Sequence, residues 1–287
     1  MHPQTYIKPI SMKKYLCICA FAALLCACHS DEPSQSQLVT FNLSGFIQES
    51  ESMGPRRAPI YDESEGGTAL TDIYAFDGTA LLAHQTNDQD EFGTISLELS
   101  HGAHNLSFIA TRSTGISVED GVMTFGSVRS TFGKLYALNV SGSTGAQDLT
   151  LDRISGQLVI TINDAFPATA NEIEFVINPR YTKLDVTNLH GVDAAEFSQK
   201  VSCTSKVGMT GVQYTFNTIC PSLTDETTAD VTINIYNAGG SVIYSVTIDD
   251  VRLASNTKTM LSGNLFTSPS ASVSVNHSWN SNIVGSW

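Results

Sequence analysis

The segment VTINIYNAGGSVIYSVTI (residues 231–248) decides the fold class of this chain. Apolar side chains occupy every second position on both sides of Asn237-Ala-Gly-Gly240. The alternating positions are Val231, Ile233, Ile235, Val242, Tyr244, Val246 and Ile248. A period of two is typical of half-buried β-strands, and an Asn/Gly-rich segment between two such runs favours a turn. We therefore predict an antiparallel hairpin.

The same alternation recurs along the chain. Asp77-Gly78 separates Ile73–Phe76 from Ala80–His84, and this dipeptide favours a tight hairpin turn. The alternation in 95–99 and 106–110 predicts a second hairpin around Ser100-His101-Gly102. Further strands are predicted at 38–47, 135–140, 158–162, 173–177 and 258–266. No long helical pattern occurs, so the sequence predicts antiparallel β-sandwiches.

The number of predicted strands suits two tandem antiparallel β-sandwich domains, an all-β fold. We place the boundary near Leu149–Gly156, which gives an N-terminal domain at residues 38–150 and a C-terminal domain at residues 151–267. Residues 268–287 are mostly polar, and they form either an extra strand or a loose tail.

The N-terminal residues have the features of a signal peptide. Lys13 and Lys14 precede an apolar run from Tyr15 to Ala27. The run is too short for a transmembrane helix, which needs about 20 apolar residues. We therefore predict that residues 1–27 are removed and that translation starts at Met12. Cleavage at another small residue is the alternative.

Leu25-Cys26-Ala27-Cys28 resembles the lipobox of bacterial lipoproteins. The resemblance implies cleavage between Ala27 and Cys28 and acylation of Cys28, which would hold the protein to the outer membrane. Residues 28–37 would be a lipidated tether. His29-Ser30-Asp31-Glu32 resembles the surface-export signal of Bacteroidetes lipoproteins, and a solvated linker is the alternative interpretation.

Composition argues against a nucleic-acid partner. The 287-residue chain has a formal net charge of −13, and its acidic residues are dispersed rather than grouped. Nucleic-acid binding needs a basic surface to neutralise phosphates. The dispersed acids indicate solubility and repulsion from anionic surfaces.

Two of the six cysteines remain in the predicted mature body, Cys203 and Cys220. If 197–203 and 212–220 form a simple hairpin, the two thiols lie at opposite ends of it, roughly 25 Å apart at strand rise. A disulfide needs Cα atoms within about 7 Å. This geometry favours two buried free thiols, with a disulfide as the alternative.

The sequence offers little catalytic or metal chemistry. His101 and His104 flank a predicted turn, but no further ligand completes a metal site. Asn87-Asp88-Gln89-Asp90-Glu91 lacks the glycine and the spaced acid of a calcium-binding loop. Gly142-Ser143-Thr144-Gly145 joins two predicted strands and lacks a partner histidine. We expect no enzyme activity, no cofactor and no metal.

Three phrases resemble the fimbrillin superfamily of Bacteroidales, which comprises shaft, tip and anchor subunits of type V pili. They are LTDIYAFDG (70–78), LDRISGQL (151–158) and TKTMLSGNLF (257–266). The resemblance implies two transthyretin-like sandwiches and assembly with other pilus subunits by β-strand addition. In the shaft subunits of that family, a trypsin-like protease cuts after an arginine in the loop that follows the first strand and so releases that strand.

Arg56-Arg57-Ala58 lies in the long loop after the first predicted strand, where such a cut would occur. Cleavage after Arg57 would give a shaft or tip subunit, whereas an uncut chain would remain a lipid-tethered anchor. An ordinary exposed basic pair is the alternative.

We therefore predict a surface-exposed, lipid-anchored outer-membrane protein of a fimbrium that supports adhesion through an unidentified ligand. The alternative is a carbohydrate-binding surface lipoprotein of a glycan-uptake system, with exposed aromatics such as Tyr61, Trp279 and Trp287 stacking on sugars.

Overall fold

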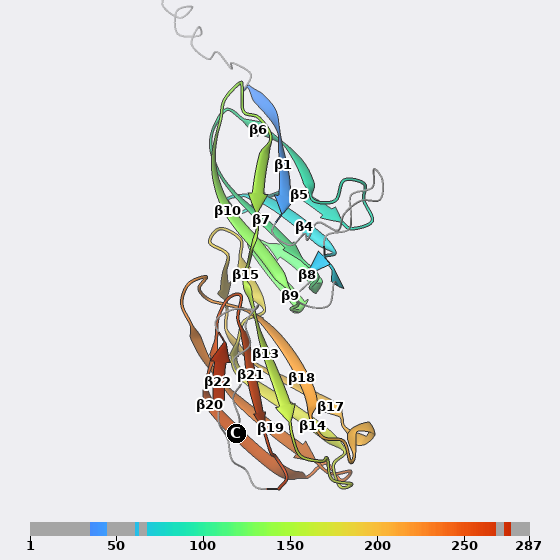
Figure 1. Ribbon diagram of the computed structural model, residues 1–287. Coiled ribbons are helices and arrows are strands. Elements are labelled where there is room, and N and C mark those ends of the chain that lie inside the picture. Colours follow the sequence, from blue (N-terminus) through green and yellow to red (C-terminus); the bar gives the residue numbers. More distant parts are fainter. Residues whose placement is uncertain (1–34, 45–60, 63–67, 268–272, 277–287) are drawn as a thin grey trace, which may run out of the picture. The chain divides into compact units, whose positions relative to one another are not determined.

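The computed structural model describes residues 35–44, 61–62, 68–267 and 273–276, which form β-strands and one short 3-10 helix (Figure 1). The described residues from Gln37 onward belong to one compact unit. The predicted all-β sandwich class is confirmed.

Two sheets enclose the core of the N-terminal half. One has the strand order β11 (Gln147–Thr150), β1 (Ser36–Ser44) and β6 (Thr94–Ser100). The other has the order β12 (Asp152–Arg153), β10 (Thr131–Val140), β7 (Gly102–Thr111), β4 (Asp72–Asp77) and β5 (Ala80–Thr86). Apolar side chains from both sheets, including Phe41, Leu97 and Phe108, form one buried cluster between them.

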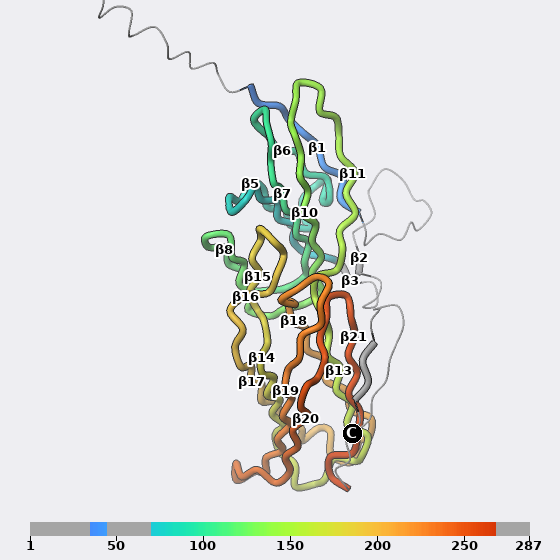
Figure 2. Tube along the Cα trace, turned by 90° about the vertical axis from the view of Figure 1, so that its left-hand side faces the viewer, coloured from blue at the N-terminus to red at the C-terminus, as the bar shows by residue number. Residues whose placement is uncertain are grey.

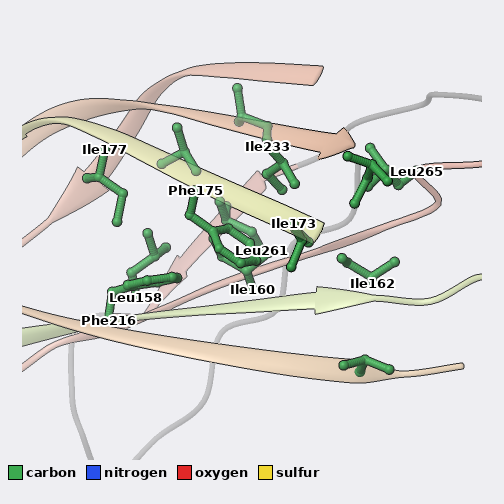
Figure 3. Close-up of a cluster of buried hydrophobic side chains, with 14 of the residues drawn as sticks. Leu158, Ile160, Ile162, Ile173, Phe175, Ile177, Phe216, Ile233, Leu261 and Leu265 are labelled. Atoms are coloured by element: carbon green, nitrogen blue, oxygen red, sulfur yellow. The ribbon is translucent and has the colours of Figure 1, made fainter. Parts of the chain in front are cut away.

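Two further sheets enclose the core of the C-terminal half. One has the order β18 (Val212–Ile219), β13 (Ser155–Ile162), β21 (Lys258–Gly263) and β22 (Val273–Asn276). The other has the order β17 (Ala195–Ser202), β14 (Glu172–Arg180), β19 (Thr227–Tyr236) and β20 (Val242–Leu253). Figure 3 shows side chains such as Ile160, Phe175 and Leu261 packed between these sheets. The 3-10 helix η2 (Thr204–Lys206) follows β17.

A fifth sheet takes strands from both halves. Its order is β16 (His190–Val192), β15 (Lys183–Asp185), β9 (Val122–Ser127) and β8 (Thr114–Glu119). Strand β9 pairs antiparallel with β15, with Met123 opposite Leu184. The β8–β9 hairpin and the β15–β16 hairpin accordingly lie side by side in Figure 2. A third buried cluster, which includes Phe76, Met123 and Leu184, packs around this sheet. A short pair, β2 (Tyr61–Asp62) and β3 (Thr68–Ala69), completes the described strands.

The two halves share one strand order. The order β11-β1-β6 corresponds to β21-β13-β18, and β10-β7-β4-β5 corresponds to β20-β19-β14-β17. In each half the first strand runs parallel to a late one, β1 to β11 and β13 to β21. These parallel pairs were not predicted, because alternation in a strand does not reveal the direction of its neighbour.

Two of the predicted hairpins are confirmed. Strands β4 and β5 pair around Gly78, whose φ is +56°. Strands β19 and β20 pair around the 237–241 turn, where Asn237 N donates to Ser241 O at 3.0 Å.

One predicted hairpin, around Ser100-His101-Gly102, is wrong. Strand β6 pairs with β1, whereas β7 pairs with β4 and β10 in the opposite sheet. Strands β17 and β18 likewise lie in opposite sheets, so the hairpin assumed in the argument about Cys203 and Cys220 does not form. In both places the chain crosses from one layer to the other. The alternation is the same in either arrangement, because it reports which face is buried and not which strand is adjacent.

Candidate functional site

The first strand, β1, lies in the middle of its sheet, between β11 and β6. Phe41, Asn42, Leu43 and Ser44 pair in parallel register with residues 147–150 of β11. At the end of β1, Leu43 N donates to Gly93 O and Leu151 N donates to Ser44 O, both at 2.8 Å. Because both of its edges are paired, removal of β1 would leave two strands without partners.

The inward face of β1 is deeply buried. Val39 and Phe41 are 0% exposed and Leu43 is 4% exposed. The Phe41 ring lies 4.8 Å from the Phe108 ring and 6.3 Å from the Tyr136 ring, measured between centroids. Burial of each such side chain contributes about 1.5–3 kcal/mol. Without β1, its sheet would open an apolar slot into the core of the N-terminal half.

The outward face of β1 carries polar contacts to both neighbouring strands. Thr40 Oγ1 lies 3.0 Å from Ser96 Oγ of β6. Asn42 Nδ2 donates to Asp148 Oδ1 of β11 at 2.9 Å. These hydrogen bonds are exposed, so each contributes little free energy, but together they fix the register of the strand.

Strand β1 contacts segments that are distant in the sequence. Thr40 and Ser96 are 56 positions apart. The Gln37 side-chain amide donates to Thr144 O, 107 positions away, at 2.6 Å. The slot is therefore lined by β6, β11 and the opposite sheet, together with residues between strands such as Leu70.

The sequence-predicted processing sites lie outside the described residues. These are Ala27 and Cys28 at the lipidation site, and Arg56, Arg57 and Ala58 at the protease site. The side chains of Tyr61, Trp279 and Trp287 also lie outside the described part. In the described part of the chain, no helix has the length and apolar character needed to cross a membrane.

Part of the predicted tail forms an extra strand. Strand β22 pairs antiparallel with β21, with Val273 opposite Leu261 and Asn276 opposite Lys258. It lies beyond β21 in a sheet whose N-terminal counterpart, β11-β1-β6, has no described strand beyond β11.

Cys203 and Cys220 are free thiols, and both are buried. Cys203 follows β17 and Cys220 follows β18, so they lie at the ends of strands in opposite sheets. Burial raises the pKa of Cys203 and raises that of Cys220 to about 12. The thiols therefore stay protonated near neutral pH, which makes them poor nucleophiles and poor metal ligands.

The two histidines considered for a metal site have different environments. His101 is an exposed turn residue. His104 Nδ1 lies 2.6 Å from Asp77 Oδ2, and its Nε2 lies 2.8 Å from Ser100 O. The hydrogen bond to Asp77, and then that to Ser100, raises the pKa of His104. Among the described residues, 87–91 included, no group of three His, Cys, Asp or Glu side chains is placed to hold a metal ion.

The outer face of the β17-β14-β19-β20 sheet carries a polar network that the sequence analysis missed. Glu174 Oε2 accepts from Tyr236 Oη at 2.6 Å and from Asn234 Nδ2 at 3.1 Å, while its Oε1 accepts from Ser198 Oγ at 2.9 Å. The hydrogen bond from Tyr236 is the largest cause of the lowered pKa of Glu174. Lys200 Nζ lies 3.6 Å from the Tyr236 ring centroid. Polar residues at alternate positions of three strands were the available signal.

No protein-family model matches the chain, and no curated protein matches it in sequence. Among solved structures, a "putative adhesin" from Bacteroides ovatus has a TM-score of 0.52 at 11% identity, over 75% of this chain and 83% of that one. "Putative polysaccharide binding proteins" from Bacteroides thetaiotaomicron give a TM-score of 0.50 at 11% identity, over 83% and 95%. The fimbrial anchor protein Mfa2 from Porphyromonas gingivalis gives 0.47 at 12% identity, over 84% and 98%. The chain thus shares the fold of the two Bacteroides proteins.

Proposed function

We propose that this protein is a cell-surface lipoprotein that acts as a structural or anchoring subunit of a type V pilus and supports adhesion by strand-exchange assembly. The observation that carries the proposal is the position of β1, which is central in its sheet and buries Val39, Phe41 and Leu43 in the core. The shared fold with a Bacteroides ovatus protein described as an adhesin supports the same role.

The functional groups in this proposal are backbone amides and carbonyls. Release of β1 would leave the facing edges of β11 and β6 unpaired and would open an apolar slot between them. A strand from a neighbouring subunit would fill that slot. Such an interface needs neither a catalytic side chain nor a cofactor. It would also dissociate slowly, because the donor strand must leave the ladder and the core together.

Two roles follow from the fate of the segment after β1. Cleavage after Arg57 would separate the body from the lipid on Cys28 and free the slot, as a shaft or tip subunit requires. An uncut chain would keep β1 in place and hold the body at the outer membrane, as an anchor requires.

The mass of the protein recovered from cells distinguishes these roles. A lipidated N-terminus at Cys28 is expected for an anchor, and an unlipidated N-terminus at Ala58 is expected for a shaft or tip subunit. The variant Cys28→Ser should move the protein out of the membrane fraction, whereas the matched control Cys26→Ser should not. Membrane attachment of Cys28→Ser at the wild-type level would contradict the lipoprotein assignment.

Strand exchange is tested with a synthetic peptide of residues 36–44. After cleavage at Arg57, the body should take up the labelled peptide in exchange for its own β1 and resist dissociation in detergent. A peptide carrying Phe41→Asp should not bind, because it would bury a charge in the slot. Equal uptake of both peptides would contradict insertion into the slot.

The second candidate function is carbohydrate binding in a glycan-uptake system. The observation that favours it is the network of Glu174, Asn234, Ser198 and Tyr236 on an open sheet face, because carboxylate, amide and hydroxyl groups next to an aromatic ring suit sugar hydroxyls and ring faces. The fold shared with a protein described as polysaccharide binding agrees with this alternative.

A glycan array followed by calorimetry separates the two candidates. Micromolar binding of a soluble glycan that Tyr236→Ala removes and Tyr244→Phe preserves would favour uptake. Strand-linked oligomers without glycan binding would favour the pilus.

A further inference from the structure

Three strands of the N-terminal half, β10, β7 and β4, are buried on both faces over part of their length. One face packs in the N-terminal core, where the rings of Phe108 on β7 and Phe41 on β1 lie 4.8 Å apart between centroids. The other face packs in the third buried cluster, which includes Ile109 of β7 and Phe76 of β4. These strands are thus the middle one of three layers, between the β11-β1-β6 sheet and the fifth sheet. We call them the floor of the β1 slot.

The burial of the floor is most complete in β4. Ile73, Tyr74, Ala75 and Phe76 are consecutive and all buried. Ile73 and Ala75 belong to the N-terminal core, whereas Tyr74 and Phe76 belong to the third cluster. Because the side chains of a strand alternate between its two faces, loss of β1 would uncover only the face of Ile73 and Ala75. The opposite face of β4 would stay buried.

The C-terminal half supplies part of the layer behind the floor. Its buried residues in the third cluster are Ile154, Leu184, Val186, Leu189 and Ile219. Leu189 lies directly on the floor, since a Cβ on Gly133 of β10 would be only 2.9 Å from Leu189 Cδ1. The backbone of β10 therefore packs against a side chain of the C-terminal half.

Backbone hydrogen bonds join the two parts of this layer. Strand β9 of the N-terminal half pairs with β15 of the C-terminal half. Beyond that ladder, Phe125 N donates to Thr182 O and Val186 N donates to Gly121 O, both at 2.9 Å. Among the described residues of β1, none belongs to the third cluster. The layer behind the floor is therefore held in place without β1.

We propose that the fifth sheet keeps the floor of the slot folded when β1 is absent, so that the empty slot stays open for an incoming strand. A sheet that loses its cover exposes apolar side chains and unpaired edges, which favour collapse and aggregation. Here the uncovered floor keeps its other face buried in a cluster that the C-terminal half completes. The purpose of this support rests on the proposed strand exchange, whereas the support itself does not.

Native-state hydrogen exchange on the full chain tests the support, because it needs neither cleavage nor a partner. The amides of Leu43 and Leu151 report the departure of β1, since they donate to Gly93 O and Ser44 O and lose these partners when β1 leaves. The amides of β4 and β7 report the floor. In Phe41→Ala, which weakens the packing of β1, the two reporter amides should exchange about tenfold faster or more than in the wild type. The floor amides should remain clearly slower than the reporters.

A second substitution in the third cluster should remove this difference. Leu184→Ala truncates a fully buried side chain, and together with Phe41→Ala it should speed exchange of the floor amides by about tenfold or more over Phe41→Ala alone. Leu158→Ala is the matched control, because Leu158 is equally buried but packs in the C-terminal core. Combined with Phe41→Ala, it should leave the floor amides slower than the reporters. If the Leu184 double variant does not fold, Val186→Ala makes a smaller truncation in the same cluster and should act in the same direction.

Two results would overturn the proposal. One is that the floor amides of Phe41→Ala exchange as fast as those of Leu43 and Leu151. The other is that the Leu184 and Leu158 double variants show the same exchange at the floor. Uptake of the 36–44 peptide tests the proposed function separately. A protected floor in a cleaved protein that takes up no peptide would contradict strand exchange and would still support the role of the fifth sheet.

Discussion

Strands β1 and β13 occupy the same place in the two halves of the molecule, yet the chain holds them in different ways. Each lies between a parallel neighbour and one further strand, β1 between β11 and β6, and β13 between β21 and β18. Each also contributes alternate apolar side chains to the core of its own half.

The two strands differ in the burial of their second face. In β13 every residue from Ser155 to Ile160 is buried, whereas β1 alternates buried residues with the half-buried Thr40, Asn42 and Ser44. The start of β13 also packs tightly on backbone, since a Cβ on Gly156 would lie 2.5 Å from Ala254 O.

This difference in burial and in chain connection indicates that β1 is better suited to exchange than β13. Only Ile154 separates β13 from β12, so β13 continues a chain that is already paired on its N-terminal side. Strand β1 is followed by the long segment that carries Arg56 and Arg57. The C-terminal half therefore has a first strand, β13, that is fixed at its N-terminal end. In the N-terminal half, β1 is held only by its buried face, by backbone hydrogen bonds to its neighbouring strands and by exposed polar contacts.

The largest expected effect comes from the core of β1. Phe41→Ala should lower the free energy of unfolding by about 3–5 kcal/mol, because it removes a fully buried ring and leaves a cavity. Leu38→Ala, on the same strand but 65% exposed, should change it by less than about 0.5 kcal/mol. Urea unfolding of both variants gives the comparison.

Cleavage at Arg57 tests directly whether β1 can leave the folded protein. After cleavage at Arg57, Phe41→Ala should release β1 on dilution, whereas Ile160→Ala in β13 should destabilise its half without releasing any strand. Equal unfolding energies for Phe41→Ala and Leu38→Ala would show that β1 does not occupy its slot in solution.

The next effect concerns the second face of β13. Gly156→Ala should cost about 1–3 kcal/mol, because its Cβ would meet the Ala254 carbonyl at 2.5 Å and Cys220 Sγ at 3.1 Å. Gly142→Ala is the matched control, since its Cβ would have only His101 nearby, at 3.9 Å. Thermal unfolding measures both. If the two variants unfold at the same temperature, the start of β13 is not closely packed.

The sequence predicts the features that local residues determine, and it does not predict those that depend on contacts between distant segments. Gly78 and the Asn237–Gly240 turn mark the β4–β5 and β19–β20 hairpins locally, and both form. The crossing between β6 and β7 has no such local mark. Which strands become neighbours is decided by packing between distant segments, so the parallel partners of β1 and β13 could not be assigned.

The third buried cluster could have been predicted from the sequence, but a search for alternating apolar residues overlooks it. Ile73, Tyr74, Ala75 and Phe76 are consecutive and all buried, because one face of β4 packs in the N-terminal core and the other against the sheet shared by the two halves. A continuous apolar run of this kind indicates a strand buried on both faces.

A smaller effect distinguishes the halves by pH. His104 is protonated when it donates to both Asp77 and Ser100, and its pKa is raised in the folded state. Its stabilisation is therefore complete below the unfolded value of about 6.5 and is lost as the pH rises through the folded pKa.

The variant His104→Gln measures this contribution. It should cost about 1 kcal/mol at acidic pH and less at alkaline pH, and it should act on the N-terminal half only. The exposed His101→Gln is the control, and urea unfolding at several pH values is the measurement. A cost independent of pH would mean that the hydrogen bonds of His104 do not depend on its protonation.

The smallest effect concerns the polar contact between β1 and β11. A double-mutant cycle of Asn42→Ala and Asp148→Ala should give a coupling of about 0.2–1 kcal/mol, because their hydrogen bond of 2.9 Å is exposed. Stability would hardly change, but peptide exchange into the cleaved protein should become faster, since this contact must break before β1 leaves. The matched control pair in the C-terminal half is Thr232 and Thr247, whose Oγ1 atoms are 2.9 Å apart on the β19–β20 hairpin. Their cycle should give a similar coupling and leave the exchange rate unchanged. If both cycles leave it unchanged, polar contacts do not control the departure of β1, and the buried Val39, Phe41 and Leu43 must set its rate alone.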